Sequence, residues 1–240
     1  MSRFPFPIPY GWFHVGYSAE LSSGEVRAVR YFGRDLALWR DQDGNAHLQD
    51  AYCPHLGANI AVGGKVVGNL IECPWRFTGE GRVAEIDYAQ RLNDKACLPT
   101  YPVLERHGVV MAWYHPHGVA PLYQLPEVPE CSNPEFVGPF STGHTIRTCL
   151  QEMAENTADA AHFVTIHRHP GQAHYDEFSF DGPSMIMKST QKFPSSHGPV
   201  EGTLNTDTAG FGFAIVRYRT LVEICMVTTT APVDAETSQQ

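Results

Sequence analysis

Residues 53–81 read CPHLGANIAVGGKVVGNLIECPWRFTGEG, and two Cys-Pro pairs frame this stretch. Cys53-Pro54 is followed by His55, and after seventeen further residues Cys73-Pro74 begins. Glycines near both pairs indicate turns at the ends of β-strands, and two such loops can converge on a metal. Thiolate and imidazole ligands suit zinc or an iron-sulfur centre. Cys53, His55 and Cys73 are therefore candidate metal ligands.

Short β-rich runs alternate with turn signals from residue 25 to about 115, which is typical of an antiparallel β domain. These runs are VRAVRYF (26–32), DLALW (35–39), AHLQDAY (46–52), KVVGNLIEC (65–73), CLPTYPVL (97–104) and HGVVMAWY (107–114). A Pro-rich passage follows and is typical of a linker. We therefore divide the chain into a β domain over 1–118, a linker over 119–139 and a second domain over 140–240.

The ligand pattern around the two Cys-Pro pairs resembles that of Rieske domains, which carry C-x-H and then C-x-x-H, and the resemblance covers roughly residues 10–118. It implies a 2Fe-2S cluster in which Cys53 and Cys73 bind the inner iron and His55 the outer iron. The fourth ligand would be a histidine at position 76. Arg76 stands there instead, and its protonated guanidinium has no lone pair for a metal.

The segment CPWRFTGEGR resembles the family's sequence with a His-Gly-Trp tripeptide removed after Trp75. This predicts a cluster without its fourth ligand. His107 and Cys97 are conceivable replacements. His107 lies between a turn and a strand, where a strand-edge residue is the simpler interpretation, and Cys97 would change the charge of the site.

A second candidate site lies in the helical stretch CLQEMAENTADAAHFVTIHRHPG (149–171), which has the spacing N-x-x-D-x-x-H-x4-H. On an ideal helix Asp159 and His162 lie about 60° apart, whereas His162 and His167 lie about 140° apart. A regular helix would not aim both imidazoles at one metal. If they share one, the helix must loosen or end between them, as in a π-type bulge.

This spacing resembles the mononuclear iron motif of Rieske non-haem iron oxygenases. The resemblance implies that His162 and His167 are two members of a 2-His-1-carboxylate triad that binds Fe(II). Asp159 would orient His162 and carry electrons from a neighbouring subunit's cluster, and Asn156 would lie beside the iron. The third ligand would be a carboxylate further towards the C-terminus, and we assign none of the carboxylates available there: Glu201, Asp207, Glu223, Asp234 and Glu236.

The second domain shows one helix followed by the strand-like runs SMIMKSTQKF, VEGTLNT, GFAIVRYR and TLVEICMVTTTA. The predicted fold is therefore mainly β with α+β: a Rieske-type antiparallel β domain followed by a partial helix-grip catalytic domain with an antiparallel sheet. Because the chain stops just after a strand, we expect either that this domain is small or that its last part is absent.

The net charge of -9 argues against nucleic acid as a partner, and no apolar run is long enough for a transmembrane helix. Pro5, Pro7 and Pro9 interrupt the aromatic N-terminus, so we expect no signal peptide and a cytoplasmic location. The resemblance implies electrons from a ferredoxin or NAD(P)H-dependent reductase, dioxygen, a hydrophobic substrate and a homotrimer.

The segments FPIPYGWFHVG (6–16) and DAAHF (159–163) are most similar to the steroid-ring hydroxylase and cholesterol desaturase branch of this family. Hydroxylation or desaturation of a steroid or sterol is therefore the expected reaction. With one ligand missing at each metal site, two alternatives stay open: an inactive fragment, and a zinc- or iron-binding module without oxygenase activity.

Overall fold

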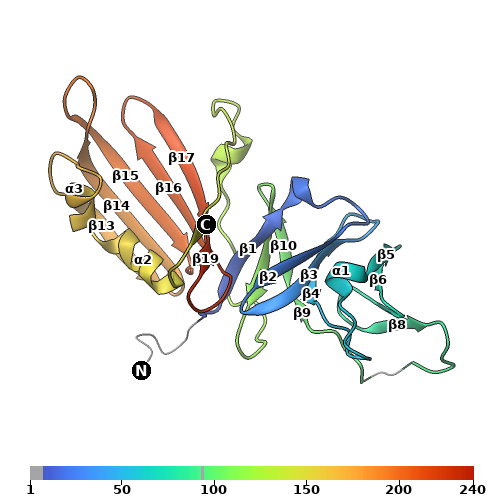
Figure 1. Cartoon of the computed structure of the whole chain (residues 1–240). Helices are drawn as coiled ribbons and strands as arrows, with labels where there is room; N and C mark the ends of the chain where they lie inside the picture. The colour runs from blue at the N-terminus through green and yellow to red at the C-terminus, as the bar shows by residue number, and fades with distance from the viewer. Residues whose placement is uncertain (1–7, 93–94) are drawn as a thin grey trace, which may run out of the picture.

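The structure is a computed structural model that describes residues 8–92 and 95–240. Pro5 and Pro7, on which the absence of a signal peptide was argued, lie outside these residues. The molecule is elongated and built almost entirely from antiparallel sheets (Figure 1). A five-stranded sheet with two helices occupies one end, a pair of sheets the middle, and a small four-stranded sheet the other end. No helix among the described residues is long and apolar enough to cross a membrane.

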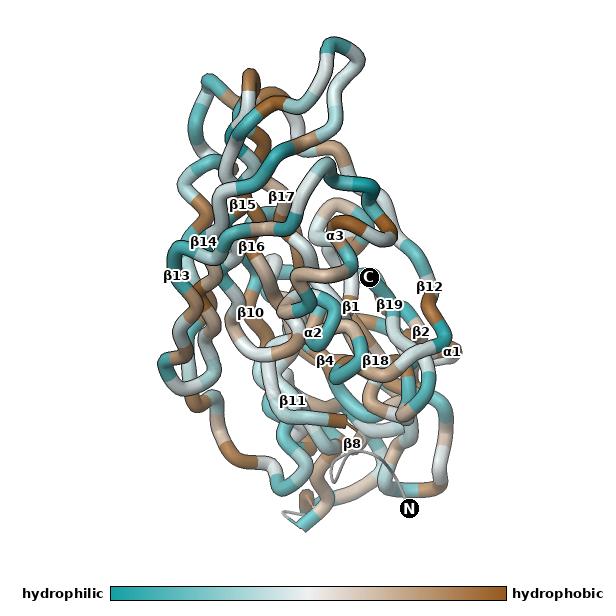
Figure 2. The backbone as a smooth tube through the Cα atoms, turned by 90° about the vertical axis from the view of Figure 1, so that its left-hand side faces the viewer, coloured by the Kyte–Doolittle hydropathy of each residue, from teal (hydrophilic) through white to brown (hydrophobic). Residues whose placement is uncertain are grey.

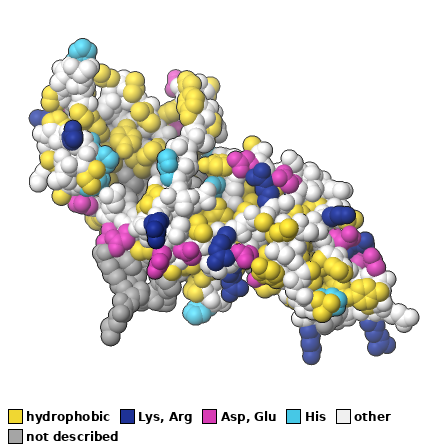
Figure 3. Space-filling model, in the orientation of Figure 1, with side chains coloured by type: hydrophobic (Ala, Val, Ile, Leu, Met, Phe, Trp, Pro, Cys, Tyr) yellow, Lys and Arg dark blue, Asp and Glu magenta, His cyan; other side chains and the backbone are white. Residues whose placement is uncertain are grey.

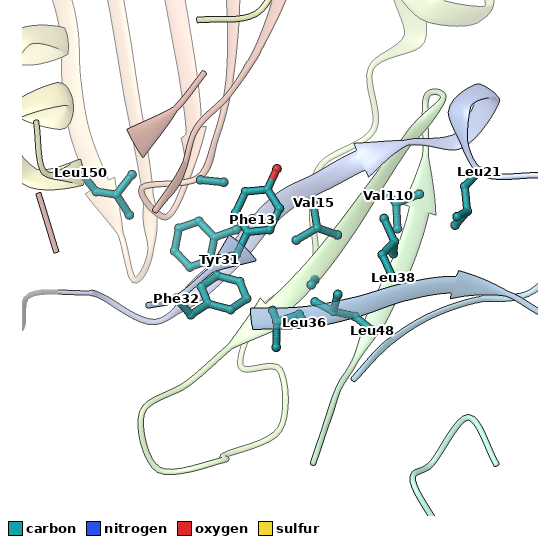
Figure 4. Close-up of a cluster of buried hydrophobic side chains, with 12 residues drawn as sticks. Phe13, Val15, Leu21, Tyr31, Phe32, Leu36, Leu38, Leu48, Val110 and Leu150 are labelled. Carbon is teal, nitrogen blue, oxygen red and sulfur yellow. The ribbon is translucent and has the colours of Figure 1, made fainter. Parts of the chain in front are cut away.

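The middle of the molecule consists of two sheets with the strand orders β1-β11-β10 and β2-β3-β4-β9. Their strands are β1 (Gly11–Tyr17), β2 (Val26–Tyr31), β3 (Arg34–Arg40), β4 (Ala46–Asp50), β9 (Thr100–Tyr101), β10 (Val103–Arg106) and β11 (Val109–Tyr114), with a short 3-10 turn at Ser18–Glu20. The sheets enclose a cluster of apolar side chains (Figure 4). Leu36 and Leu38 of β3 point into this cluster, whereas Ala37 and Trp39 point from its other face into the core of the neighbouring small sheet.

That small sheet forms the tip of the molecule and has the strand order β5-β6-β7-β8. Its elements are α1 (Ile60–Gly63), β5 (Lys65–Val67), β6 (Leu70–Glu72), β7 (Trp75–Phe77) and β8 (Val83–Ile86). The β-rich run 65–73 forms a tight hairpin of two short strands. Gly68 has φ 61 and with Asn69 makes the two-residue turn between the paired Val67 and Leu70.

The far end carries the sheet β13-β14-β15-β16-β17, with α2 and α3 against one face (Figures 1 and 2). Its elements are β12 (Thr145–Ile146), α2 (Leu150–Ala158), α3 (Ala161–Thr165), β13 (His174–Asp181), β14 (Ser184–Phe193), β15 (Val200–Ala209), β16 (Phe213–Arg219), β17 (Glu223–Thr229), β18 (Ala231–Pro232) and β19 (Ser238–Gln239). Buried and more exposed residues alternate along β14, as a sheet with one covered face requires. The predicted combination of two antiparallel β units with one helical segment is confirmed.

The helical segment is not the single helix that the sequence predicted over 149–171. It breaks at Asp159, which has φ -82 and ψ 106 and ends α2. The carboxylate of Asp159 accepts a hydrogen bond from the main-chain N–H of Ala161 at 2.8 Å, so it caps the first turn of α3. Asp159 and His162 are therefore related by a turn between two helices, not by the spacing of one.

The Pro-rich passage 119–139 is irregular apart from a 3-10 turn at Pro129–Ser132, and it packs between the two halves of the molecule. Its Leu125 and Val128 are buried in one cluster with residues from both halves: Trp12, Met111, Trp113, Ala209, Phe213 and Ile215. The main-chain oxygen of Tyr123 also accepts a 3.0 Å hydrogen bond from the Trp12 indole. The passage is therefore part of a shared core.

His14 in β1 is a buried histidine, 4% exposed, and neither ring nitrogen has a hydrogen-bond partner among the described residues. Burial lowers the pKa of His14. The backbone of Gly16 and the charge of Glu20 act in the opposite direction and offset a smaller part of this lowering. Below about pH 6.5 the unfolded chain binds a proton that folded His14 resists, so stability should fall as the pH falls towards the lowered folded-state pKa.

We expect His14→Phe to raise the free energy of unfolding by about 1–3 kcal/mol at neutral pH, because it removes an unpaired buried polar group. The substitution should also reduce the fall in the free energy of unfolding between pH 7 and pH 5. Denaturant unfolding across this range measures both effects, with His197→Phe at an exposed histidine as the control. An unchanged pH dependence in His14→Phe would show that His14 is not the group responsible.

Candidate metal centres

The two cysteines of the first candidate site lie side by side at the tip. The sulfur atoms of Cys53 and Cys73 are 3.2 Å apart, and Cys53 is buried. A tight turn positions Cys53, because its carbonyl accepts the N–H of Gly57 and its own N–H donates to Ala58. Burial, and then the neighbouring Cys53, raise the pKa of Cys73 to about 11. Two thiolates that bind one tetrahedral metal at about 2.3 Å lie about 3.8 Å apart. The two sulfur atoms would therefore have to move only slightly further apart to bind an ion.

His55, two residues after Cys53, is held by aromatic contacts. Its ring stacks on the Trp75 indole with centroids 4.5 Å apart and an angle of 15° between the planes. The Trp75 N–H donates to the hydroxyl of Tyr88 at 2.6 Å, and this hydroxyl lies 3.5 Å from Nε2 of His55. Tyr88 was not among the residues expected at the site, because only the fold brings it there.

Arg76 faces away from the cysteines. In β7 the side chains of Trp75 and Phe77 enter the buried cluster that contains Cys53, so the side chain between them emerges on the opposite face of the sheet. There the guanidinium is paired with three carboxylates, those of Glu72, Glu85 and Asp87. These carboxylates, Glu85 first, raise the pKa of Arg76 further above its usual range.

The two conceivable replacements for the fourth cluster ligand lie in other surroundings. Cys97 is exposed and forms an isolated bridge with Arg82. His107, in the turn between β10 and β11, lies 4.0 Å from a carboxylate oxygen of Glu127. Within residues 8–92 and 95–240, no three His, Cys, Asp or Glu side chains are grouped closely enough to hold a metal ion.

The second candidate site brings His162 and His167 together. Their ring centroids are 5.2 Å apart with an angle of 70° between the planes, and His162 is buried. Nδ1 of His162 contacts the main-chain oxygen of Asp159. A carbonyl can only accept, so Nδ1 carries the proton and Nε2 keeps its lone pair, which is the tautomer of a metal-binding imidazole. The structure therefore places the main-chain oxygen of Asp159, not its carboxylate, against His162.

The expected loosening of the helix between these histidines is confirmed. The helix α3 ends at Thr165, and the His162 carbonyl accepts the N–H groups of both Ile166, at 2.8 Å, and His167, at 3.2 Å. The bond to His167 spans five residues, as in a π-turn. Arg168 follows with φ 55, a left-handed conformation that costs a residue with a side chain about 1–2 kcal/mol.

His169, in the loop after α3, is tied to the sheet. Its Nδ1 lies 3.0 Å from Oε1 of Gln191, a residue of β14 that is 3% exposed. The ring lies 6.3 Å from that of His167, between centroids. Burial, more than the nearby histidines, lowers the pKa of His169.

A cavity of about 420 Å³ separates α2 and α3 from the sheet, and both His162 and His167 line it. This size lies within the range of small-molecule sites, about 300–1,000 Å³. Most of its wall is apolar: Met153, Phe163, Met187, Leu204, Val216 and Met226. Figure 3 shows apolar side chains gathered in the hollow over this sheet. Asn156 also lines the cavity, as expected for a residue beside the metal.

None of the C-terminal carboxylates considered for the third iron ligand lines this cavity. Asp207 is 2.8 Å from Arg217, and Glu223 is 3.0 Å from Arg219. The carboxylate that does line the cavity is Glu152, one helical turn before Asn156 on the same face of α2. Sequence reasoning did not single it out, although its spacing from Asn156 could have.

Two family models match the chain. The Rieske 2Fe-2S domain matches residues 11–102, and the 3-ketosteroid 9alpha-hydroxylase C-terminal domain matches residues 112–240. The second model alone covers more than half of the chain. The first match includes Cys53, His55 and Cys73, and the second includes His162 and His167.

Curated relatives agree with these two matches. The chain is 42% identical to cholesterol 7-desaturase nvd of Xenopus laevis over 163 residues, which are 66% of this chain and 36% of the relative. It is 34% identical to the probable oxygenase component of 3-ketosteroid-9-alpha-monooxygenase of Rhodococcus rhodochrous over 187 residues, 75% of this chain and 46% of the relative. The chain thus spans less than half the length of these relatives.

Solved structures share the fold. Dicamba monooxygenase bound to dicamba superposes with a TM-score of 0.73 at 17% identity, over 98% of this chain and 76% of that one. NdmB of Pseudomonas putida CBB5 gives a TM-score of 0.76 at 18% identity, over 95% and 71%. At this identity the likeness shows the fold alone, and nothing about substrates.

Proposed function

The chain belongs to the Rieske non-haem iron oxygenases, in the group that has the 3-ketosteroid 9alpha-hydroxylase C-terminal domain, and from this premise we propose that its catalytic domain binds a sterol-like substrate beside a mononuclear iron. The observation that carries the proposal is the apolar cavity of about 420 Å³ onto which His162 and His167 both open. Relatives whose names include a cholesterol desaturase and a ketosteroid monooxygenase support this substrate class.

Two residues of the catalytic domain have the chemistry of iron ligands. His162 and His167 would hold it, since the tautomer of His162 leaves Nε2 free and the two rings lie 5.2 Å apart. Bound Fe(II) supplies open positions for dioxygen activation in sites of this type. The protein's part is to orient the two imidazoles and to present an apolar substrate from the sheet side. Asn156 adds a polar group at the cavity wall.

The donor set at the tip does not fit a complete Rieske cluster. Cys53 and Cys73 suit one iron, but His55 alone would serve the other, and Arg76 is engaged on the opposite sheet face. We propose that the fourth ligand is missing and that this chain does not couple a ferredoxin or reductase to substrate oxidation. We also propose the domain bounds and the assembly that the sequence suggested: a β domain over 1–118, a linker over 119–139, a catalytic domain over 140–240, and a homotrimer.

Zinc at the two thiols and His55 is the competing interpretation of the tip, because zinc takes mixed Cys and His ligands. Metal analysis separates the two, since zinc has no partly filled d shell and gives no visible charge-transfer bands.

We expect Val216→Trp to weaken sterol binding about tenfold or more, because the indole would fill part of the cavity and leave less apolar surface to bury. A fluorescent sterol such as dehydroergosterol reports binding by energy transfer from protein tryptophans. Val222→Trp is the matched control, because Val222 is 62% exposed in the turn after β16 and is not among the cavity residues. Equal affinities in the two variants would place the sterol elsewhere.

A further inference from the structure

The segment that follows α3 is fastened to the sheet at one side chain. His169 lies two residues after His167, and its ring packs against Phe163 at 5.4 Å and edge-on against Phe193 at 5.1 Å, between centroids. Its main-chain N–H donates to the Phe163 carbonyl at 2.9 Å. The segment therefore returns over the end of α3 and meets β14.

A directed chain of hydrogen bonds determines the proton position on His169. The Leu204 carbonyl accepts from the hydroxyl of Ser189 at 2.9 Å, so the hydroxyl oxygen is left to accept from Gln191 Nε2 at 2.8 Å. The amide oxygen of Gln191 then faces Nδ1 of His169 at 3.0 Å. Since that oxygen can only accept, Nδ1 of His169 must donate. Ser189 and Gln191 are both buried, which protects the direction of the chain from water.

The backbone is held on both sides of His167. On one side its N–H is bound to the His162 carbonyl at 3.2 Å, and on the other the chain passes through Arg168, with φ 55, into His169. A left-handed arginine persists only where its surroundings hold it, and such residues occur often at functional sites. The contact between His169 and Gln191 is the side-chain hydrogen bond on the sheet side that can hold this turn, beside the packing of the same ring on Phe193.

We propose that His169 and Gln191 form a positioning pair that holds the His167 imidazole in place to bind the metal. The proposal rests on the iron site proposed above. It assigns His169 no contact with the metal or the substrate, so His169 acts through the backbone of residues 166–169. Without the pair, Arg168 can relax to an extended conformation, and the His167 ring can move away from that of His162.

The test measures Co(II) binding to the full chain, by its visible absorption bands and by competition with a chelator. Cys53→Ser and Cys73→Ser are present throughout, in the protein called wild type here as well, so that the thiols at the tip bind no cobalt. We expect His169→Phe, which keeps the aromatic packing but loses the donor, and Gln191→Leu, which loses the acceptor, each to weaken binding about 10–100-fold. Both should shift the cobalt bands, because the ligand geometry changes. His169→Asn keeps an N–H donor and should stay within about threefold of the wild type.

Thermal unfolding of the metal-free variants controls for a general structural effect. Equal cobalt affinity and unchanged bands in His169→Phe would overturn the positioning role while leaving the iron site intact. So would equal losses in His169→Phe and His169→Asn, since the donor would then not matter. If the wild type itself binds no Co(II), the proposed iron site fails, and the positioning role fails with it.

Discussion

Reconstitution of the native chain with iron and sulfide under anaerobic conditions is expected to give no Rieske-type EPR signal on reduction, whereas a variant with His-Gly-Trp inserted after Trp75 should give one. The reason is the ligand count. Cys53 and Cys73 lie 3.2 Å apart and can hold one iron, and in the proposed ligand set the second iron would have only His55. The insertion restores the C-x-x-H spacing after Cys73. Iron and acid-labile sulfide per chain, measured with the EPR spectrum, quantify the difference.

A substitution at position 76 should not have the effect of the insertion. Arg76→His should not restore the signal, because position 76 lies on the sheet face opposite the buried cluster with Cys53. Its cross-strand partners there are Glu72 and Glu85. An insertion of Ala-Gly-Trp has the same length as the first variant but lacks the histidine, so it should also give no Rieske-type EPR signal. A Rieske signal from the native chain would mean that another residue completes the cluster.

The strands of the large sheet could be predicted well where burial alternates. The run SMIMKSTQKF was predicted as a strand, and β14 has the same bounds, Ser184–Phe193. Met185, Met187, Ser189 and Gln191 all face inwards along it. The strand β13, with the sequence HYDEFSFD, was not predicted, because its residues are largely exposed and its charged positions mask the alternation.

The helical region shows why spacing alone was not enough. The sequence places Asp159 and His162 at one helical interval, but the carboxylate of Asp159 caps a new helix and divides the segment in two. The helix does break before His167. This break was expected because two imidazoles at that spacing cannot lie on the same side of a regular helix. The break between the two candidate ligands was therefore easier to predict than the turn at Asp159.

The residues that support the sites could not be found from local patterns. Tyr88 meets His55 across 33 positions of the chain, and His169 meets Gln191 across 22. Neither contact has a periodic signal, since each depends on how strands far apart in sequence are paired. A histidine in a loop next to Pro170 is an ordinary surface residue until a buried glutamine is placed beside it.

His162→Ala is expected to remove Fe(II) and Co(II) binding at the catalytic domain almost completely. The loss should exceed the about 10–100-fold that changes around a metal ligand cost, because a ligand itself is removed and His167 alone cannot hold the ion. His162 is also the better anchored of the two, being buried with Nδ1 on the Asp159 carbonyl. His174→Ala is the matched control, because that histidine is exposed on β13 beside Asp176.

Chemical rescue separates a lost ligand from a damaged fold. His162→Gly leaves a space of imidazole size beside the cavity, so free imidazole should restore cobalt binding in a concentration-dependent way if His162 is a ligand. The same addition should do nothing for His174→Ala. Sterol binding should survive His162→Gly, since the apolar residues of the sheet that line the cavity are unchanged. Undiminished metal binding in His162→Ala would remove His162 from the site and leave the two-histidine interpretation without support.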